Sequence, residues 1–294
     1  MTISGFSMAR NAISLDYPLV ESIRSLLPLC DEVVIALGRS EDDTLERVRA
    51  IGDPKVRIIE TVWDPAHFVH GAVNAVQTNI ALEACSGNWC VYLQADEVLH
   101  EDDIPALRAA IERSQDDERV EGLLFDYLHF WGSYDRIQTA HHWYRHEVRA
   151  IRNGRGIRSW KSAQGFRADG RKLRVRRSGA RIFHYGWVRH PLRMKRKQIA
   201  LDSVHHDADW VKRRHPDAGS AFDYGDLRTL ARFRCTHPAV MRERIARKEW
   251  SAPLEGEGRM RHRHEKLSSR VLSFIENRVL HARIGEYRNY VLID

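Results

Sequence analysis

Short apolar runs alternate with helically spaced apolar residues over the first hundred positions. The apolar runs are rich in β-branched residues, which is typical of strands buried on both faces of a parallel sheet. The segments between them place apolar side chains three and four residues apart, as an amphipathic helix does. Strands are expected at Thr2–Phe6, Val33–Leu37, Val56–Val62 and Trp89–Leu93, and helices at Tyr17–Leu29, Thr44–Ile51, Ala72–Ala84 and Ile104–Arg113.

This alternation predicts an α/β fold, in which a mostly parallel central sheet carries helices on both faces. Residues 120–190 have a different pattern, with strands separated by aromatic and Gly-rich loops. From Pro191 onward the pattern is helical and basic, which predicts a helical C-terminal extension over residues 191–294. Further strands are expected at Leu123–Phe130, Glu147–Ile151 and Ala180–Tyr185, and further helices at Met194–Arg214, Leu227–Phe233, Pro238–Lys248 and Glu265–Ile284.

The composition is that of a globular protein with an excess of positive charge. The chain has 294 residues, 43% of them hydrophobic, and a formal net charge of +7, which favours anionic partners such as nucleotides. The four cysteines form no CxxC pair, so we expect reduced thiols in a cytoplasmic protein. No run approaches the roughly 20 apolar residues of a membrane span, and we expect no signal peptide.

Two acidic clusters follow predicted strands. They are Glu41-Asp42-Asp43, after the second strand, and Asp96-Glu97, after the fourth. In doubly wound sheets, ligands bind beyond the carboxyl ends of the strands, so both clusters are candidate binding residues. The first cluster could instead cap the helix that begins at Thr44, and the second could be an acidic pair at a helix start.

Several motifs appear in a particular order. They are Arg10-Asn11 after the first strand, Asp31-Glu32 before the second, Ser40, Asp42 and Thr44 in the next loop, Asn79 in a helix, Gln94-Ala95-Asp96-Glu97 after the fourth strand, and His184-Tyr185-Gly186-Trp187. This series resembles the inverting family 2 glycosyltransferases with a GT-A fold. The resemblance is good over residues 1–100 and looser to about residue 190. It implies a Rossmann-like sheet, with a nucleotide-sugar-binding half at 1–100 and an acceptor-binding half at 101–190.

The resemblance also implies roles for individual residues. Arg10, Asn11, Asp42, Asn79 and Gln94 would bind the nucleotide, and Asp96 and His184 would bind a divalent metal, Mn²⁺ or Mg²⁺. Gln94 stands where the family usually has a carboxylate, and its amide can bond a ribose hydroxyl but offers no charge. Asp96 must therefore recruit Glu97, His184 or the diphosphate itself. His184 could equally be a satisfied core histidine.

An inverting transferase also needs a carboxylate base near the acceptor hydroxyl. Asp135, in a Gly- and aromatic-rich loop, and Glu147, on a predicted strand, are equal candidates. Aromatic residues between 127 and 160 could stack on a sugar ring or form a core. The histidine pairs His141-His142 and His205-His206 are expected at the surface, because neighbouring side chains diverge.

The expected reaction moves a sugar from a UDP-, GDP- or dTDP-linked donor to a glycan or lipid-linked acceptor. The basic stretches Arg171–Arg181 and Arg189–Lys197 are expected to be solvated faces, and they could also bind the diphosphate or dock on the anionic inner face of the membrane. An apolar face around Leu267 and Phe274 predicts core or homodimer packing. A nucleotidyltransferase of similar fold is the alternative. A nucleic-acid-binding protein would leave the strand-end carboxylates unexplained, so no nucleic acid partner is expected.

Overall fold

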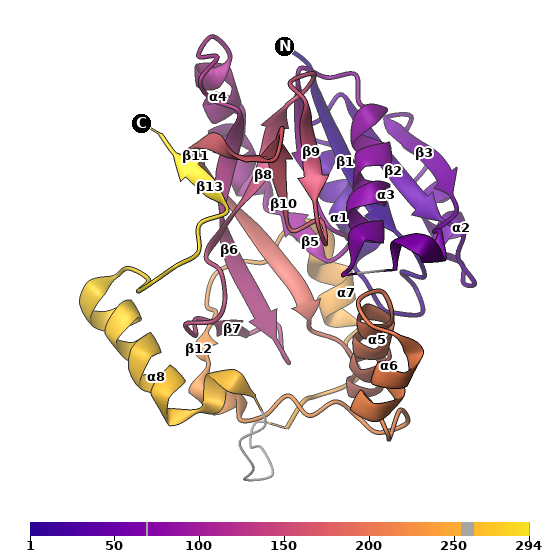
Figure 1. Ribbon diagram of the computed structural model, residues 1–294, viewed down its shortest axis with the longest axis vertical. Coiled ribbons are helices and arrows are strands. Elements are labelled where there is room, and N and C mark those ends of the chain that lie inside the picture. Colours follow the sequence, from indigo (N-terminus) through magenta and orange to yellow (C-terminus); the bar gives the residue numbers. More distant parts are fainter. Residues whose placement is uncertain (69, 254–261, 294) are drawn as a thin grey trace.

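A computed structural model describes residues 1–68, 70–253 and 262–293. One mixed sheet runs through the molecule, with helices packed around it (Figure 1). The strands are β1 (Ile3–Ala9), β2 (Glu32–Gly38), β3 (Val56–Thr61), β4 (Trp89–Tyr92), β5 (Glu97–Leu99), β6 (Gly122–Trp131), β7 (Arg136–Gln138), β8 (His146–Arg152), β9 (Ile157–Trp160), β10 (Gly165–Ala168), β11 (Arg171–Trp187), β12 (Ala231–Arg232) and β13 (Tyr290–Leu292). The α-helices are α1 (Leu19–Leu26), α2 (Thr44–Arg49), α3 (Ala72–Glu83), α4 (Ile104–Ser114), α5 (Pro191–Ser203), α6 (Ala208–Arg214), α7 (Arg242–Ala246) and α8 (Leu267–Phe274).

The N-terminal part of the sheet is parallel, as its sequence pattern predicts. The strand order is β3-β2-β1-β4-β8-β6-β11-β10-β9, and the first four strands run in the same direction. β8 pairs antiparallel with both β4 and β6, while β6 and β11 are parallel. The sheet therefore continues without a break from the first hundred residues into the next ninety, and the predicted α/β fold is confirmed.

Strand β2 shows how the sheet acquires a core on each face. Val33 and Ile35 belong to the core cluster that also holds residues of α1 and α4, while Val34 and Ala36 belong to a second cluster on the other face, where α3 contacts β2. Because alternate side chains of a strand face opposite ways, a continuous apolar run is what a strand covered on both faces requires. All four cysteines are free thiols, as expected.

The region after residue 190 differs from its prediction in detail. The single helix expected over Met194–Arg214 is two helices, because Asp207 accepts a hydrogen bond from the Trp210 backbone N–H and begins α6 anew. The helix expected at Leu227–Phe233 is wrong: a short 3-10 turn ends at Thr229, and β12 then pairs with β7. β13 pairs with β11, so the extension also contributes strands to the sheet.

The last predicted helix, Glu265–Ile284, is shorter than expected. Its α-helical part is α8, and a π-helical segment, Ile275–Leu280, follows it. None of the helices in the three described stretches is long and apolar enough to cross a bilayer.

Candidate active site

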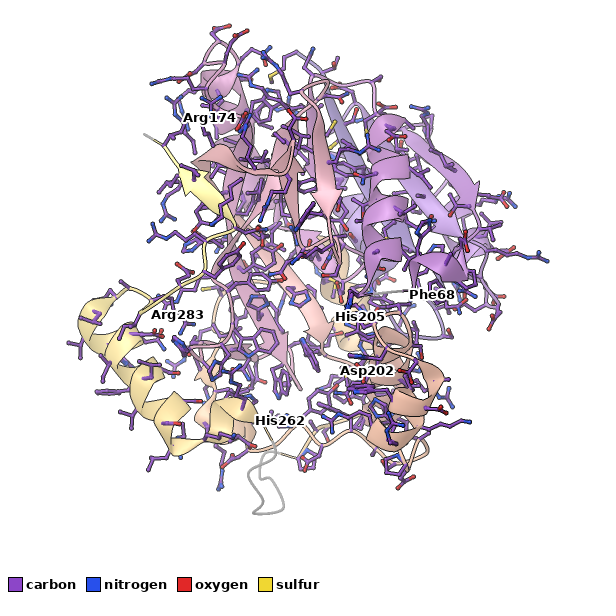
Figure 2. The ribbon with its side chains drawn as sticks, viewed as in Figure 1. Phe68, Arg174, Asp202, His205, His262 and Arg283 are labelled. Atoms are coloured by element: carbon purple, nitrogen blue, oxygen red, sulfur yellow. The ribbon has the colours of Figure 1, made fainter. Side chains whose placement is uncertain are left out.

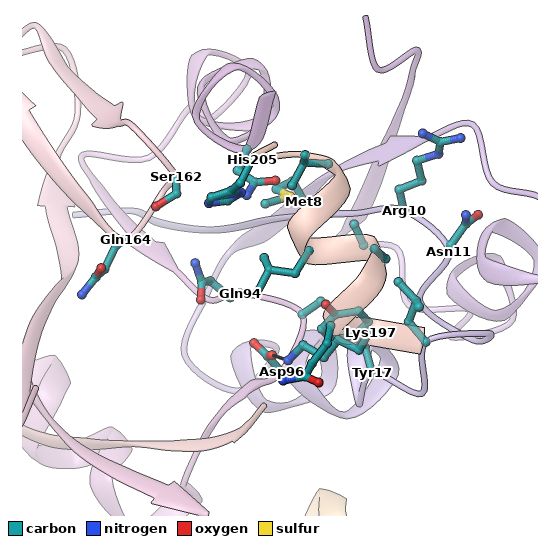
Figure 3. A pocket seen from close by; sticks show the side chains of 18 of the residues that line it. Met8, Arg10, Asn11, Tyr17, Gln94, Asp96, Ser162, Gln164, Lys197 and His205 are labelled. Carbon is teal, nitrogen blue, oxygen red and sulfur yellow. Dashed lines mark hydrogen bonds and ion pairs between the residues drawn. The ribbon is translucent and has the colours of Figure 1, made fainter. Parts of the chain in front are cut away.

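A cavity of about 700 Å³ lies at the carboxyl ends of β1 and β4 (Figure 3). Residues 8–11 at the end of β1 and 94–96 after β4 form one wall, and α5 forms another. A crevice forms at the carboxyl ends of parallel strands where the segments that follow two neighbouring strands leave the sheet in different directions. A ligand site is therefore expected here. Phe68 and His205, which are distant in the sequence and are both labelled in Figure 2, line the same cavity.

Asp96 is the one carboxylate among the described residues that line the cavity. It follows β4, is only 6% exposed, and its Oδ2 accepts a 2.8 Å hydrogen bond from Lys197 Nζ of α5. Burial alone would raise the pKa of Asp96. The neighbouring Lys197, His184 and Arg189 together outweigh burial and hold the pKa of Asp96 well below its usual range, so this carboxylate is ionised.

Lys197 is held in place by a second acceptor. Its Nζ also donates to the Gly186 carbonyl oxygen at 2.7 Å, and its side chain is buried. Burial, followed by the nearby charge of Arg189, lowers the pKa of Lys197 to about 8, while Asp96 opposes that shift. The cavity therefore contains a buried Lys–Asp pair, which points into it from two different walls (Figure 3).

His184 approaches Asp96 from the opposite side. It lies on β11, where it is paired with Glu97 of β5, and its Nε2 is 3.8 Å from Asp96 Oδ1. Burial lowers the pKa of His184, although Asp96 and Glu97 act in the other direction, which favours the neutral ring. Its Nδ1 is 2.8 Å from Nδ1 of His129, whose Nε2 is 2.8 Å from the Tyr144 carbonyl oxygen.

The carboxylate of Glu97 is fully hydrogen-bonded to other groups, so it is not available as a second metal ligand beside Asp96. Its two oxygens accept 2.8 Å hydrogen bonds from Nε and Nη2 of Arg149, and Tyr127 Oη donates a third at 2.8 Å. The Gln94 backbone N–H donates a fourth at 3.0 Å. Both Glu97 and Arg149 are completely buried. The Asp-Glu motif is thus split between a cavity carboxylate and a buried structural ion pair.

The donor atoms around Asp96 fit a divalent metal ion that is completed by a ligand. Asp96 Oδ1 and His184 Nε2 face each other across a gap, and oxygen and imidazole nitrogen are both ligands of divalent ions. Gly186 keeps this space open, because a Cβ there would lie 2.4 Å from His184 Nε2 and 2.9 Å from Asp96 Oδ2. No cluster of three or more His, Cys, Asp or Glu that could hold a metal occurs in the described part of the chain, so phosphate oxygens would have to complete the coordination.

Three of the predicted nucleotide-binding residues line the cavity. Arg10 and Asn11 follow β1, and Gln94 follows β4. Arg10 lies over the ring of Trp63, 5.9 Å from its centroid, and donates through Nε to the Arg39 carbonyl. Asn11 has a φ of 53°, in the left-handed region, and its Oδ1 accepts from the Glu41 backbone N–H. The Gln94 amide donates to the Ala163 carbonyl at 3.2 Å.

The other two predicted nucleotide-binding residues lie outside the cavity wall. Asp42 accepts hydrogen bonds from the backbone N–H groups of Ser14 and Thr44, at 2.7 and 3.0 Å, and so fixes the loop at the start of α2. Asn79 accepts from the Ser159 backbone N–H at 2.8 Å and ties α3 to β9. Their observed contacts are structural, and a direct role at the nucleotide stays a prediction.

Neither candidate base lines the cavity. Asp135 is exposed in the turn between β6 and β7, where it contacts Ser133 and lies 3.7 Å from Arg136. Glu147 is buried, which raises its pKa, and it accepts from its neighbour's backbone N–H at 3.0 Å and from Asn289 at 3.5 Å. A role for either residue as a base stays a prediction.

The cavity also contains residues that sequence reasoning missed. His142 and His205 line it, although their doublets predicted surface positions. Lys197 lies in a basic stretch that was expected to be a solvated face, with diphosphate binding as an alternative; it is buried, as is Met194 on the same helix. The i, i+3 spacing of these two residues is the signal that could have placed Lys197 on the inner face. His129 is one of many aromatic residues in β6, and its sequence position carries no such signal.

A match to a protein family supports the resemblance over part of the chain. Residues 16–118 match the family described as Glycosyl transferase family 2. No curated protein matches the chain. Among solved structures, S. aureus TarS 1–349 in complex with UDP is 18% identical with a TM-score of 0.33, over 44% of this chain and 36% of that one. Glucosyl-3-phosphoglycerate synthase from Mycobacterium tuberculosis, in complex with Mn²⁺, UDP and glucosyl-3-phosphoglycerate, is 23% identical with a TM-score of 0.31, over 45% of each chain. In these two comparisons the matched part covers less than half of the other chain.

Proposed function

We propose that the chain, whose residues 16–118 match the family described as Glycosyl transferase family 2, is a glycosyltransferase that moves a sugar from a nucleotide diphosphate sugar to an acceptor hydroxyl, with inversion. One observation carries the proposal. Asp96, His184 and Lys197 come from three different elements and converge at one place in the cavity, at the strand ends where this fold binds its ligand.

The diphosphate of the donor would bind at this convergence. Lys197 is a buried cation within reach of the cavity, and its ammonium would exchange part of its contact with Asp96 for phosphate oxygens. Asp96 Oδ1 and His184 Nε2 would hold a divalent ion, Mn²⁺ or Mg²⁺. When bound, such an ion supplies positive charge that stabilises the leaving diphosphate. The partial burial of these groups strengthens each interaction relative to bulk water.

The nucleoside would lie toward the end of β1. Arg10 and Asn11 offer donors and acceptors there, the Gln94 amide is placed to bond a ribose hydroxyl, and Trp63 supplies an aromatic face. Asp42 and Asn79 would support this wall from behind through the loop and helix contacts described above. These features suit a UDP-, GDP- or dTDP-linked sugar.

The acceptor would enter on the opposite side of the cavity. Ser162 and Gln164 lie there (Figure 3), and Trp143 and Tyr144 also line the cavity, a mixture of polar groups and aromatic faces that suits a sugar ring. A glycan or a lipid-linked sugar at the inner face of a membrane fits this chemistry. The proton of the acceptor hydroxyl would pass to a base, for which Asp135 and Glu147 remain the carboxylate candidates from sequence.

Ligand-induced thermal stabilisation tests this proposal. The wild-type protein, Asp96→Asn and the exposed control Asp116→Asn, which lies outside the cavity, would be melted with UDP-, GDP- and dTDP-sugars, each with and without Mn²⁺. We expect at least one donor to raise the melting temperature of the wild type and of the control, and to have little effect on Asp96→Asn. If no donor stabilises the wild type, or if Asp96→Asn responds as the wild type does, the proposal is wrong.

A further inference from the structure

A chain of three groups runs from the backbone to the proposed metal ligand. The Tyr144 carbonyl oxygen lies 2.8 Å from His129 Nε2, and His129 Nδ1 lies 2.8 Å from His184 Nδ1. His129 and His184 come from neighbouring parallel strands and are directly opposite in the register of β6 and β11. The far nitrogen of the chain, His184 Nε2, faces Asp96 across 3.8 Å.

The chemistry of these groups fixes where the hydrogens lie. A carbonyl oxygen can only accept, so His129 Nε2 must carry the hydrogen in its contact with Tyr144. The ring of His129 is 2% exposed, and its two nitrogens lie against a carbonyl oxygen and a second imidazole rather than a carboxylate. This buried setting favours the neutral ring, so its Nδ1 is an acceptor. His184 must then donate through its own Nδ1. The opposite tautomer would place two lone pairs 2.8 Å apart in a buried site.

The same assignment leaves His184 Nε2 without a hydrogen. Its lone pair points toward an ionised carboxylate oxygen at a distance too long for a hydrogen bond, and Gly186 keeps the space beside both atoms clear. Two electron-rich atoms in this arrangement are complementary to a cation between them. A metal-bound histidine commonly donates its other ring N–H to a partner that fixes the tautomer.

We propose that His129 is a positioning residue, which uses the Tyr144 carbonyl to lock His184 in the Nδ1–H tautomer and so presents the Nε2 lone pair and Asp96 to a divalent cation. This inference rests on the proposed function, because it concerns the ion that the donor diphosphate would share. His129 does not touch the cation and acts only through His184.

Packing holds His129 in the required orientation. The ring is 2% exposed, stacks on Tyr127 with centroids 5.2 Å apart, and contacts Trp143 at 4.9 Å. It is nearly perpendicular to His184, with an interplanar angle of 89°. A flipped His129 would lose its carbonyl partner in this buried setting.

Two variants separate the hydrogen-bonding role from packing. His129→Phe keeps a ring but cannot accept from His184, whereas His129→Gln supplies an amide oxygen that can. His215→Phe is a matched control: His215 is a buried histidine at the end of α6, bonded to Asp202, and it does not line the cavity. Circular dichroism would establish that each variant is folded.

The tautomer is measured by nitrogen-15 NMR on histidine-labelled protein, and Mn²⁺ binding by electron paramagnetic resonance, with and without UDP. We expect His184 of the wild type to be protonated on Nδ1. We expect His129→Phe to bind Mn²⁺ about 10- to 100-fold more weakly, the usual effect of removing such a partner, and His129→Gln and His215→Phe to stay near the wild type.

Several results would overturn the inference: a His184 protonated on Nε2 in the wild type, unchanged Mn²⁺ affinity in His129→Phe, or no Mn²⁺ binding by the wild type under either condition. The proposed function fails in a different way. A wild-type protein that binds Mn²⁺ in a His129-dependent manner but binds no nucleotide diphosphate would refute the transferase and leave the positioning role intact.

Discussion

The buried ion pair between Glu97 and Arg149 offers a sharp test of how the Asp-Glu motif is used. Glu97 accepts four hydrogen bonds, two from Arg149 and one each from Tyr127 and the Gln94 backbone. Glu97→Gln keeps the shape of the side chain but removes its charge and one acceptor oxygen. The Arg149 guanidinium, which is completely buried, would then have no counter-charge within the pair.

The expected loss of stability is large. Breaking a buried ion pair by removing one partner costs about 3–5 kcal/mol, because a charge is left buried without compensation. Each kcal/mol shifts the melting temperature of a protein in this size range by roughly 2–4 °C, so Glu97→Gln should melt on the order of 10 °C lower. Glu118→Gln is the control, because Glu118 is 78% exposed in its ion pair with Arg155 and should change stability by less than about 1 kcal/mol.

Urea unfolding followed by circular dichroism measures both variants. The double variant Glu97→Leu, Arg149→Met should recover part of the lost stability, because it removes the unpaired charge as well as the pair. If Glu97→Gln were as stable as Glu118→Gln, Glu97 would not be committed to Arg149. It would then be available to the cavity, and the division of roles between Asp96 and Glu97 would be wrong.

Three further changes test the cavity and the sheet. Lys197→Met should weaken UDP binding about 10- to 100-fold and leave uridine binding unchanged, because a charge-assisted hydrogen bond contributes about 1.5–3 kcal/mol; equal losses in calorimetric titrations would contradict this. Gly186→Ala should abolish Mn²⁺-dependent stabilisation by UDP in thermal melts, since its Cβ would meet His184 Nε2 at 2.4 Å, and an unchanged response would contradict the open space assigned there. Burial raises the pKa of Glu32, but hydrogen bonds from Ser86 and Ser4 outweigh it and lower the pKa from 4.5 to about 2. A carboxyl group whose pKa is lower in the folded protein stabilises the fold at pH values above its unfolded pKa. The loss of stability caused by Glu32→Gln should therefore be complete above about pH 5 and should disappear as the pH falls from 4.5 toward 2. A pH-independent difference in urea unfolding would count against this assignment.

The periodicity of the chain predicted the N-terminal sheet well, for a physical reason. Strands such as β2 are apolar on both faces and lie between amphipathic helices, so their local pattern and their tertiary burial agree. The pattern predicted less after residue 190. There, Ala231–Arg232 is extended because it pairs with β7, a contact almost a hundred residues away in the chain that no local pattern encodes.

The site was predictable where residues sit at strand ends and less so elsewhere. Asp96 follows a buried strand, so its place at the cavity could be derived from the fold class. His184 joined it only through the family resemblance, because β11 reaches the site by pairing with β5 and β6. Lys197 and His129 come from elements whose relative position depends on tertiary packing, and composition alone suggested a solvated face for the first.

The central claim is that Asp96 and His184, with Lys197 beside them, form the diphosphate end of a nucleotide-sugar site. A crystal structure of the protein soaked with UDP and Mn²⁺, with anomalous data collected at the manganese edge, tests it most directly. The account predicts one anomalous peak between Asp96 Oδ1 and His184 Nε2, with the diphosphate bound to it and to Lys197. UDP bound elsewhere, or UDP bound in the cavity with its diphosphate away from these three side chains, would contradict the account.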